Sequence, residues 1–422
     1  MSTTDLVAAL FALILVFVFG VFDSRPRTLH ALLLGSYVFV SPWNATFPVA
    51  LSCLWSALLL ARARRDGVAS VLPWLLAGAL VFLAPAIALR PGLSIRTWVL
   101  YPAATGLLYL WIILQTIRSF ADLKSLLVTY ATLRTFELAI YGLVQYVLGT
   151  PLLRTPITYV TSSYLGNVSA ARLYGVSAYD PVVASGCLVF ALGVWVYLAS
   201  VEARTVYWLP AGLCLVALVL TWARTGWVAA VFTMLLFVLL RGGQSMRSGR
   251  LVGSVVLATA VLVPLADFVA SRFESEARLG AEQTWTFRMM IWQAALGGWR
   301  RMTMFGPGVM DTFKEGANVS GISMSLENAI LGAFAATGWV GGLGFTALYV
   351  GSLFSVWAGW FKLRTEEPMA LAAAVVVTTQ LAMMMTFHMR YDDPHVWLVF
   401  GIAGSAALLS RRATLASSGV AT

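Results

Sequence analysis

Charged residues are scarce in this sequence. Only 11% of the 422 residues are Asp, Glu, Lys or Arg, whereas 60% are hydrophobic and the mean hydropathy is +0.84. Soluble globular domains carry about 25% charged residues, so the composition excludes that class. It predicts a polytopic membrane protein.

Cysteine and histidine are almost missing as well, with three of each. Cys53, Cys187 and Cys214 all lie inside apolar runs, where a thiol behaves as a small hydrophobe, and the sequence contains no CxxC motif. Neither a disulfide framework nor a structural zinc site is predicted. The first residues carry no basic charge and no small-residue cleavage pattern follows the first apolar run, so we expect a first span there rather than a signal peptide.

Apolar runs of bilayer length dominate the chain and predict an all-α fold of about 12 or 13 transmembrane helices. No linker or repeat separates a second domain, so residues 1–422 are expected to form a single integral membrane domain. The second and third runs are barely long enough to span, and Pro42 and Pro48 lie between them. The runs are at about 6–22, 29–43, 47–61, 70–89, 98–117, 124–149, 181–200, 206–222, 226–240, 251–270, 328–361, 369–389 and 395–410.

The net charge of +10 follows from how Lys and Arg are distributed among the loops. Most basic residues outside the longest polar segment fall on one side of this map, and the positive-inside rule places that side in the cytoplasm. Topology therefore explains the charge, and no nucleic-acid partner is predicted. The longest polar segment, Ser271 to Glu327, then lies outside, which is the periplasm if the cell is a Gram-negative bacterium and the protein is in its inner (cytoplasmic) membrane.

Within Ser271 to Glu327, five apolar residues recur at alternating steps of four and three, which predicts one apolar stripe along a helix. Such a helix either lies in the membrane interface, with its indoles at headgroup depth, or packs on other helices. Arg288 borders the stripe, and the turn Phe305-Gly306-Pro307-Gly308 follows it. The stripe consists of Trp285, Met289, Trp292, Leu296 and Trp299.

Several arginines lie near the predicted outer ends of spans. A guanidinium binds phosphate oxygens through two parallel hydrogen bonds and stays protonated, so several around one cavity mouth would hold a diphosphate. The alternative is that they snorkel to headgroups or pair with a local carboxylate. These residues are Arg172, Arg224, Arg288 and Arg390.

Glu327 and Asn328 stand at the threshold of a span. A carboxylate there is partly desolvated, which favours a role as a general base toward an acceptor hydroxyl. The alternative is an acidic residue placed near a helix N-terminus, where the helix dipole favours it.

A short outer loop combines His388, Arg390, Asp392, Asp393 and His395. Paired carboxylates are ligands that Mg²⁺ accepts, but Tyr391-Asp392-Asp393-Pro394 is also an ordinary turn sequence. No metal is predicted. His388, Arg390 and Asp392 remain secondary candidates for the site, together with Asn328.

Arg134 and Glu137 lie one helical turn apart inside a predicted span. Either charge would be costly in hydrocarbon without a partner, so we expect the two to pair or to face the protein interior. This pattern favours a structural role over a catalytic one.

Four local patterns, in this order, resemble the O-antigen ligase and O-antigen polymerase family of bacterial envelope glycosyltransferases. The resemblance covers roughly residues 172–410. One difference concerns Glu327, because ligases of the family carry His before the Asn. The patterns are Arg172-Leu173-Tyr174-Gly175 with Tyr179-Asp180-Pro181, then Leu220 to Gly226, then Arg288 and Trp292 with Phe305-Gly306-Pro307-Gly308 and Phe313, and finally Glu327-Asn328 with Thr337-Gly338-Trp339-Val340-Gly341.

The resemblance implies a C-type, inverting, metal-independent glycosyltransferase without a cofactor. Its substrate would be a glycan carried by undecaprenyl diphosphate in the lipid bilayer, and a chain-length regulator and a flippase are the expected protein partners. Arg224 and Arg288 would hold the diphosphate with help from Arg172, and Glu327 would activate the acceptor hydroxyl. The Glu327 difference favours a polymerase of repeat units.

Two alternatives remain at this point. A ligase would transfer the same glycan to lipid A core or to another terminal acceptor. A transporter or flippase would show inverted repeats and paired broken helices, and the sequence displays neither.

Overall fold

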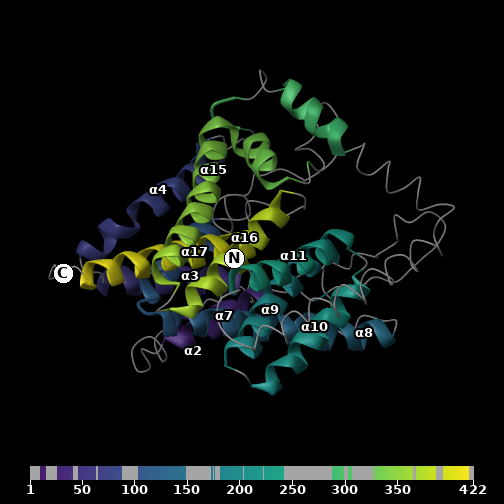
Figure 1. Ribbon diagram of the computed structural model, residues 1–422. Helices are drawn as coiled ribbons and strands as arrows, with labels where there is room; N and C mark the ends of the chain where they lie inside the picture. Colours follow the sequence, from purple (N-terminus) through teal and green to yellow (C-terminus); the bar gives the residue numbers. More distant parts are fainter. Residues whose placement is uncertain are drawn as a thin grey trace. The chain divides into compact units, whose positions relative to one another are not determined.

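The computed structural model shows a helical protein (Figure 1). Every regular element among the residues it describes is a helix, which confirms the predicted all-α class. The described residues are 10–15, 26–40, 46–62, 65–87, 103–148, 173, 175, 181–202, 204–221, 223–241, 288–298, 303–306, 326, 328–364, 367–385 and 393–417.

The chain divides into two compact units, one formed by Met1–Tyr130 with Ala295–Thr422 and the other by Ala131–Ala294. The first unit is therefore built from both ends of the chain. The single membrane domain expected from the sequence stays a prediction.

The first unit has its core around α17 (Pro394–Ser417). Trp397 of this helix is fully buried and contacts the rings of Phe82 and Phe400, with centroids 5.0 and 5.8 Å away. Helix α15 (Ala329–Leu363) packs along α17 and also along α4 (Arg65–Ile87). Further helical elements of this unit are α2 (Pro26–Gly35), a π-helical turn (Ser36–Val40), α3 (Thr46–Arg62), a second π-helical turn (Ala104–Leu108), α6 (Tyr109–Thr116) and α16 (Pro368–Met384).

Helix α7 (Phe120–Arg134) begins in the first unit, and its last turn opens the second. A π-helical segment (Thr135–Tyr141) and α8 (Gly142–Leu148) continue it without a break, as the predicted single apolar run over 124–149 requires.

The second unit is organised around α9 (Pro181–Val201), which is the most buried of the candidate spans. The indole N–H of Trp195 on α9 donates to the hydroxyl of Thr135 at 2.8 Å. Helix α10 (Trp208–Leu220), which follows a 3₁₀ turn (Thr205–Tyr207), and α11 (Arg224–Arg241) both pack on α9.

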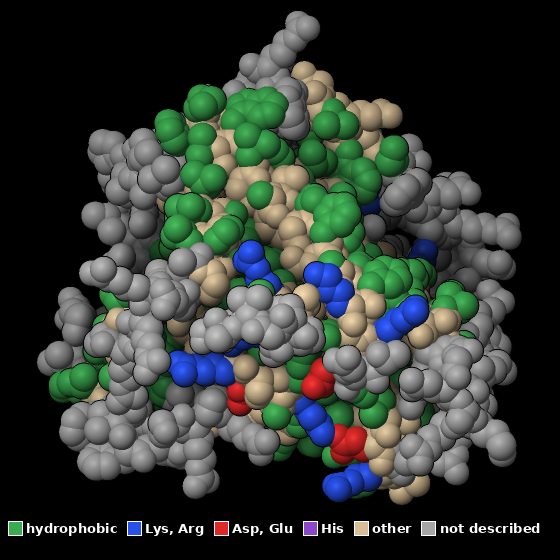
Figure 2. Space-filling view, turned by 60° about the vertical axis from the view of Figure 1, so that its left-hand side comes forward, with side chains coloured by type: hydrophobic (Ala, Val, Ile, Leu, Met, Phe, Trp, Pro, Cys, Tyr) green, Lys and Arg blue, Asp and Glu red, His purple; other side chains and the backbone are tan. Residues whose placement is uncertain are grey.

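Three described helices are long and apolar enough to cross a membrane, namely Pro181–Val201, Ala329–Leu363 and Pro394–Leu415. Shorter apolar helices occupy most of the other predicted runs, whereas the run over 251–270 lies outside the described residues. The count of 12 or 13 spans stays a prediction. On the face drawn in Figure 2, apolar side chains cover the upper part and charged side chains gather below them.

Candidate functional site

Helix α15 is broken at Gly338, whose backbone has φ 69° and ψ −166°. This conformation is essentially restricted to glycine. The break diverts the N–H groups of Trp339 and Val340 from the helix. They donate instead to the carbonyls of Thr303 and Met304, at 3.2 and 3.1 Å. The predicted outer segment is thereby attached to the helix by two backbone hydrogen bonds, which we call the clasp.

The clasp requires a second glycine. A Cβ atom at Gly306 would lie 2.4 Å from the backbone nitrogen of Gly338, and one at Gly338 would lie 2.4 Å from the nitrogen of Gly306. No side chain fits between the two backbones. The structure thus brings together two patterns that the sequence kept separate, the Phe305-Gly306 turn and the Thr337-Gly338-Trp339 stretch.

Asn328 is the N-cap of α15. Its side-chain oxygen accepts from the backbone N–H of Leu331 at 3.0 Å, which satisfies one of the free donors of the first turn. Its side-chain nitrogen donates to the carbonyl of Met385, at the end of α16, at 3.2 Å. Asn328 therefore fixes where α15 begins and connects the start of this helix to the end of α16. Glu327 is the residue directly before Asn328 in the chain. Glu327 itself lies outside the described residues.

In the second unit, the first and second sequence patterns also meet. The backbone N–H of Leu173 donates to the carbonyl of Leu220, the last residue of α10, at 2.9 Å. Gly175 lies against Glu137, because a Cβ atom there would approach the carboxylate oxygen Oε1 to 2.6 Å. The Leu173 and Gly175 positions are thus fixed between α10 and the π-helical segment. Arg172 lies outside the described residues.

Arg224 is the first residue of α11, and its side chain is exposed. The Thr221 hydroxyl shapes the turn before it, donating to the carbonyl of Leu218 at 2.7 Å and accepting from the N–H of Ala223 at 3.3 Å. A cation at a helix N-terminus is opposed by the helix dipole, whereas an anion bound there is favoured. This position therefore suits an arginine that binds an anion better than one that only supports its helix.

Residues 288–298 form a helix, as the stripe predicted. Met289 and Leu296 of the stripe are exposed, whereas Ile291 and Ala295, on another face, are buried. Because Trp292 of the stripe is partly buried, interfacial placement and packing on other helices both stay open. Arg288 is partly buried at the start of the described part of this helix; Trp285 and Trp299 lie outside it.

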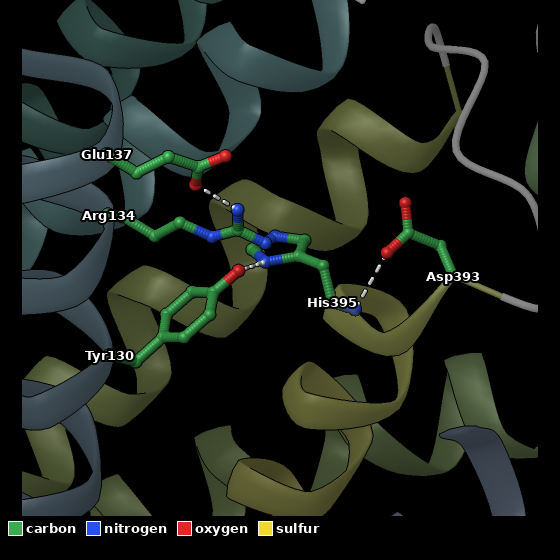
Figure 3. Close-up of polar contacts among 5 residues, drawn as sticks. All are labelled: Tyr130, Arg134, Glu137, Asp393 and His395. Carbon is green, nitrogen blue, oxygen red and sulfur yellow. Dashed lines mark hydrogen bonds and ion pairs between the residues drawn. The ribbon is translucent and has the colours of Figure 1, made fainter. Parts of the chain in front are cut away.

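Arg134 and Glu137 form an ion pair at 2.5 Å, and both side chains are buried (Figure 3). The prediction that these two charges pair is confirmed. The pair was recognisable because neither charge is tolerated alone in an apolar segment. Sequence reasoning missed that the Glu137 side chain also packs against Gly175, because the two positions are distant in the chain.

Asp393 and His395 have structural partners. The Asp393 carboxylate accepts from the backbone N–H of His395 at 2.8 Å, so it caps α17 with Pro394 in the first helical position (Figure 3). The buried His395 ring bonds Tyr130 through Nδ1 at 2.5 Å and Gln380 through Nε2 at 2.8 Å. Since the Gln380 oxygen can only accept, Nε2 carries the proton and Nδ1 accepts from the Tyr130 hydroxyl.

These contacts favour the turn interpretation of the outer loop for its described part. No group of three or more potential metal ligands occurs among the described residues. The secondary candidates His388, Arg390 and Asp392 lie outside them.

The fold and this site define a multi-pass helical membrane protein with a polar segment clasped onto a broken helix. Residues 209–346, about a third of the chain, match the model of a known family, O-antigen ligase. The match covers α10, α11, Arg288, the clasp and Asn328, and leaves the Arg172 pattern outside. A search of curated proteins found no match for the chain.

Proposed function

We propose that this protein is a polymerase that joins undecaprenyl-diphosphate-linked oligosaccharide repeat units. The match of residues 209–346 to the O-antigen ligase family model supports glycosyltransferase activity on a lipid-linked glycan. The clasp is the observation that carries the proposal. It attaches Thr303 and Met304, which follow Arg288 in the chain, to the helix that begins directly after Glu327 and Asn328.

The reaction requires one general base and several cations in fixed roles. The oxygen of the acceptor hydroxyl attacks the anomeric carbon of the donor sugar. At the same time Glu327 accepts the proton of that hydroxyl. The bond between that carbon and the diphosphate oxygen breaks on the opposite face, which inverts the configuration. The electron pair leaves with the diphosphate, whose growing charge is stabilised by Arg224 and Arg288, with Arg172 assisting.

A ligase is the second candidate, because the matched family model carries that description. The two candidates share the donor and differ in the acceptor. The Glu327 position favours the polymerase, since the resemblance places His there in ligases.

The deciding experiment uses the purified full chain in proteoliposomes with the lipid-linked repeat unit isolated from cells that lack this protein. A polymerase produces a ladder that stays on lipid diphosphate and is released by mild acid. A single acid-stable product that appears only when a lipid A core acceptor is added would identify a ligase. If neither product forms and the lipid-linked donor moves from one leaflet to the other, the result would favour a transporter.

A further inference from the structure

We infer that the end of the α15–α17 pair, remote in sequence from the proposed catalytic groups, is a binding site for the phosphate of an anionic phospholipid headgroup. This inference does not rest on the proposed function. It starts from four exposed cations, which we call the basic cluster. The cluster consists of Lys362 and Arg364 at the end of α15 and Arg411 and Arg412 on α17.

The basic cluster is brought together by helix packing. Phe345 contacts Phe400 at 5.4 Å between ring centroids, and further along both helices Gly359 lies against Ser410. The two helices therefore run in the same direction. At Gly359 a Cβ atom would come within 3.0 Å of the Ser410 hydroxyl, so the helices approach closely there.

The cations follow this contact almost immediately in both helices. With a rise of about 1.5 Å per residue, all four backbone positions lie within about 8 Å of the Gly359–Ser410 level along the helix axes. Lys362 is one turn after Gly359 on nearly the same face of α15, so it points toward α17. The four cations therefore lie at one level of the helix pair, close to its end.

None of the four makes a hydrogen bond or ion pair through its side chain with any residue that the structure describes. Glu367 is the nearest described acid along the chain, and its side chain makes no capping bond to α16. The cluster therefore has an excess of positive charge. By contrast, Arg134 is paired with Glu137. Four adjacent cations repel one another, and an anion with several acceptor oxygens removes that repulsion.

Aromatic residues place the cluster at the depth of lipid headgroups. Trp357, Trp360 and Phe361 contact one another within the roughly one and a half turns of helix before Lys362, with centroid distances between 4.7 and 6.1 Å. Phe361 is 60% exposed. Indoles collect at the membrane–water boundary, and cations just beyond them meet the phosphates.

The test measures lipid preference of the purified full chain by native mass spectrometry in micelles that contain equal amounts of phosphatidylglycerol and phosphatidylcholine. The wild type should retain phosphatidylglycerol preferentially, and high salt should remove the preference. Because one basic residue near an anionic surface contributes about 1 kcal/mol, Arg412→Gln and Lys362→Gln should each lower the preference about fivefold. The double variant should lose about 25-fold if the two cations act independently.

Arg204→Gln is the matched control, since Arg204 is equally exposed and lies in the other unit. Its preference should equal that of the wild type. The proposal is wrong if the cluster variants keep the wild-type preference, or if Arg204→Gln lowers it as much. Displacement of the lipid by millimolar inorganic phosphate or by a short DNA oligonucleotide would also overturn it, because the site would then serve a soluble anion. Thermal unfolding checks folding, and the two single variants lie on different helices, so one misfolded variant leaves the other informative.

Discussion

At the scale of single residues, Arg288 is proposed to bind phosphate through a planar fork of donors. Lysine keeps the positive charge but cannot form the two parallel hydrogen bonds that a guanidinium makes with a phosphate. Arg288→Lys should therefore lower kcat/KM nearly as much as Arg288→Ala, by about tenfold to a hundredfold, the value of one charged hydrogen bond. Polymer formation by the purified variants is the measurement, and Arg204→Lys is the control that should stay at the wild-type rate. Full activity in Arg288→Lys would contradict the bidentate role.

Glu327 distinguishes a general base from a carboxylate that only stabilises a helix. Gln keeps the shape and removes the basicity. If Glu327 is the base, Glu327→Gln should lower turnover by about 10² to 10⁴ at normal protein level and donor binding. If it only interacts with the helix dipole, turnover should be near normal and stability should fall by about 0.3 to 1 kcal/mol.

The chain offers a matched control for this change in Glu367, which directly precedes α16 as Glu327 and Asn328 precede α15. Glu367→Gln should leave turnover unchanged. Turnover in Glu327→Gln above about a tenth of the wild-type value lies outside the range of a general base and would refute the assignment.

At the scale of the element, the clasp makes the backbone of Gly338 a functional feature. Gly338→Ala meets both a strained backbone and an overlap with the nitrogen of Gly306. The strain alone should lower the free energy of unfolding by about 1–3 kcal/mol. Release of the clasp should also expose residues 303–306 to protease and lower polymer formation.

The same helix provides the control. A Cβ atom at Gly351 meets nothing within 4 Å. Gly351→Ala should therefore be neutral or stabilise the helix by about 0.5–1 kcal/mol. Thermal unfolding and limited proteolysis of the two variants, side by side, measure the difference. If the two variants have the same unfolding temperature and the same rate of proteolysis, the clasp contributes neither to stability nor to protection of the attached segment.

At the scale of the whole molecule, the proposed chemistry places the leaving-group charge on arginines. Chelation with EDTA should then leave polymerisation by the purified protein intact. The measurement is product formation with and without the chelator. Activity that disappears with EDTA and returns with Mg²⁺ would redirect attention to Asp392 and its neighbours in the outer loop.

Some features of the molecule were predictable because one stretch of sequence determines them. Apolar runs locate most helices, since backbone groups in hydrocarbon must bond within their own segment. The Arg134–Glu137 pair was predictable for a similar reason, because neither charge is tolerated alone. The stripe over 285–299 predicted a helix. It did not determine whether that helix lies in the membrane interface or packs on other helices.

Other features depend on residues far apart in the chain. The clasp uses backbone carbonyls at residues 303 and 304, and a backbone carbonyl has no signature in the sequence. His395 and Tyr130 are separated by 265 positions, so sequence reasoning grouped His395 with its loop neighbours instead. The motifs contain both Gly306 and Gly338. The sequence does not reveal that each position must be glycine because of the other.

The break in α15 also has a consequence for membranes of different thickness. A straight helix of 35 residues would be about 52 Å long, far more than the roughly 30 Å of hydrocarbon in a bilayer. The part after Gly338 has about 25 residues and reaches about 37 Å, so it can cross alone. We therefore expect the first turns, with Asn328 and the clasp, at the height of the headgroups, where the proposed lipid diphosphate would lie.

Hydrophobic mismatch should therefore move the clasp relative to the donor. A bilayer of long acyl chains would immerse the first turns of α15, and one of short chains would lift them away from the diphosphate. We expect polymer formation in nanodiscs to peak at one acyl-chain length and to fall on both sides of it, while the unfolding temperature changes little. Activity that is independent of chain length would mean that the protein adjusts its tilt rather than the height of its site.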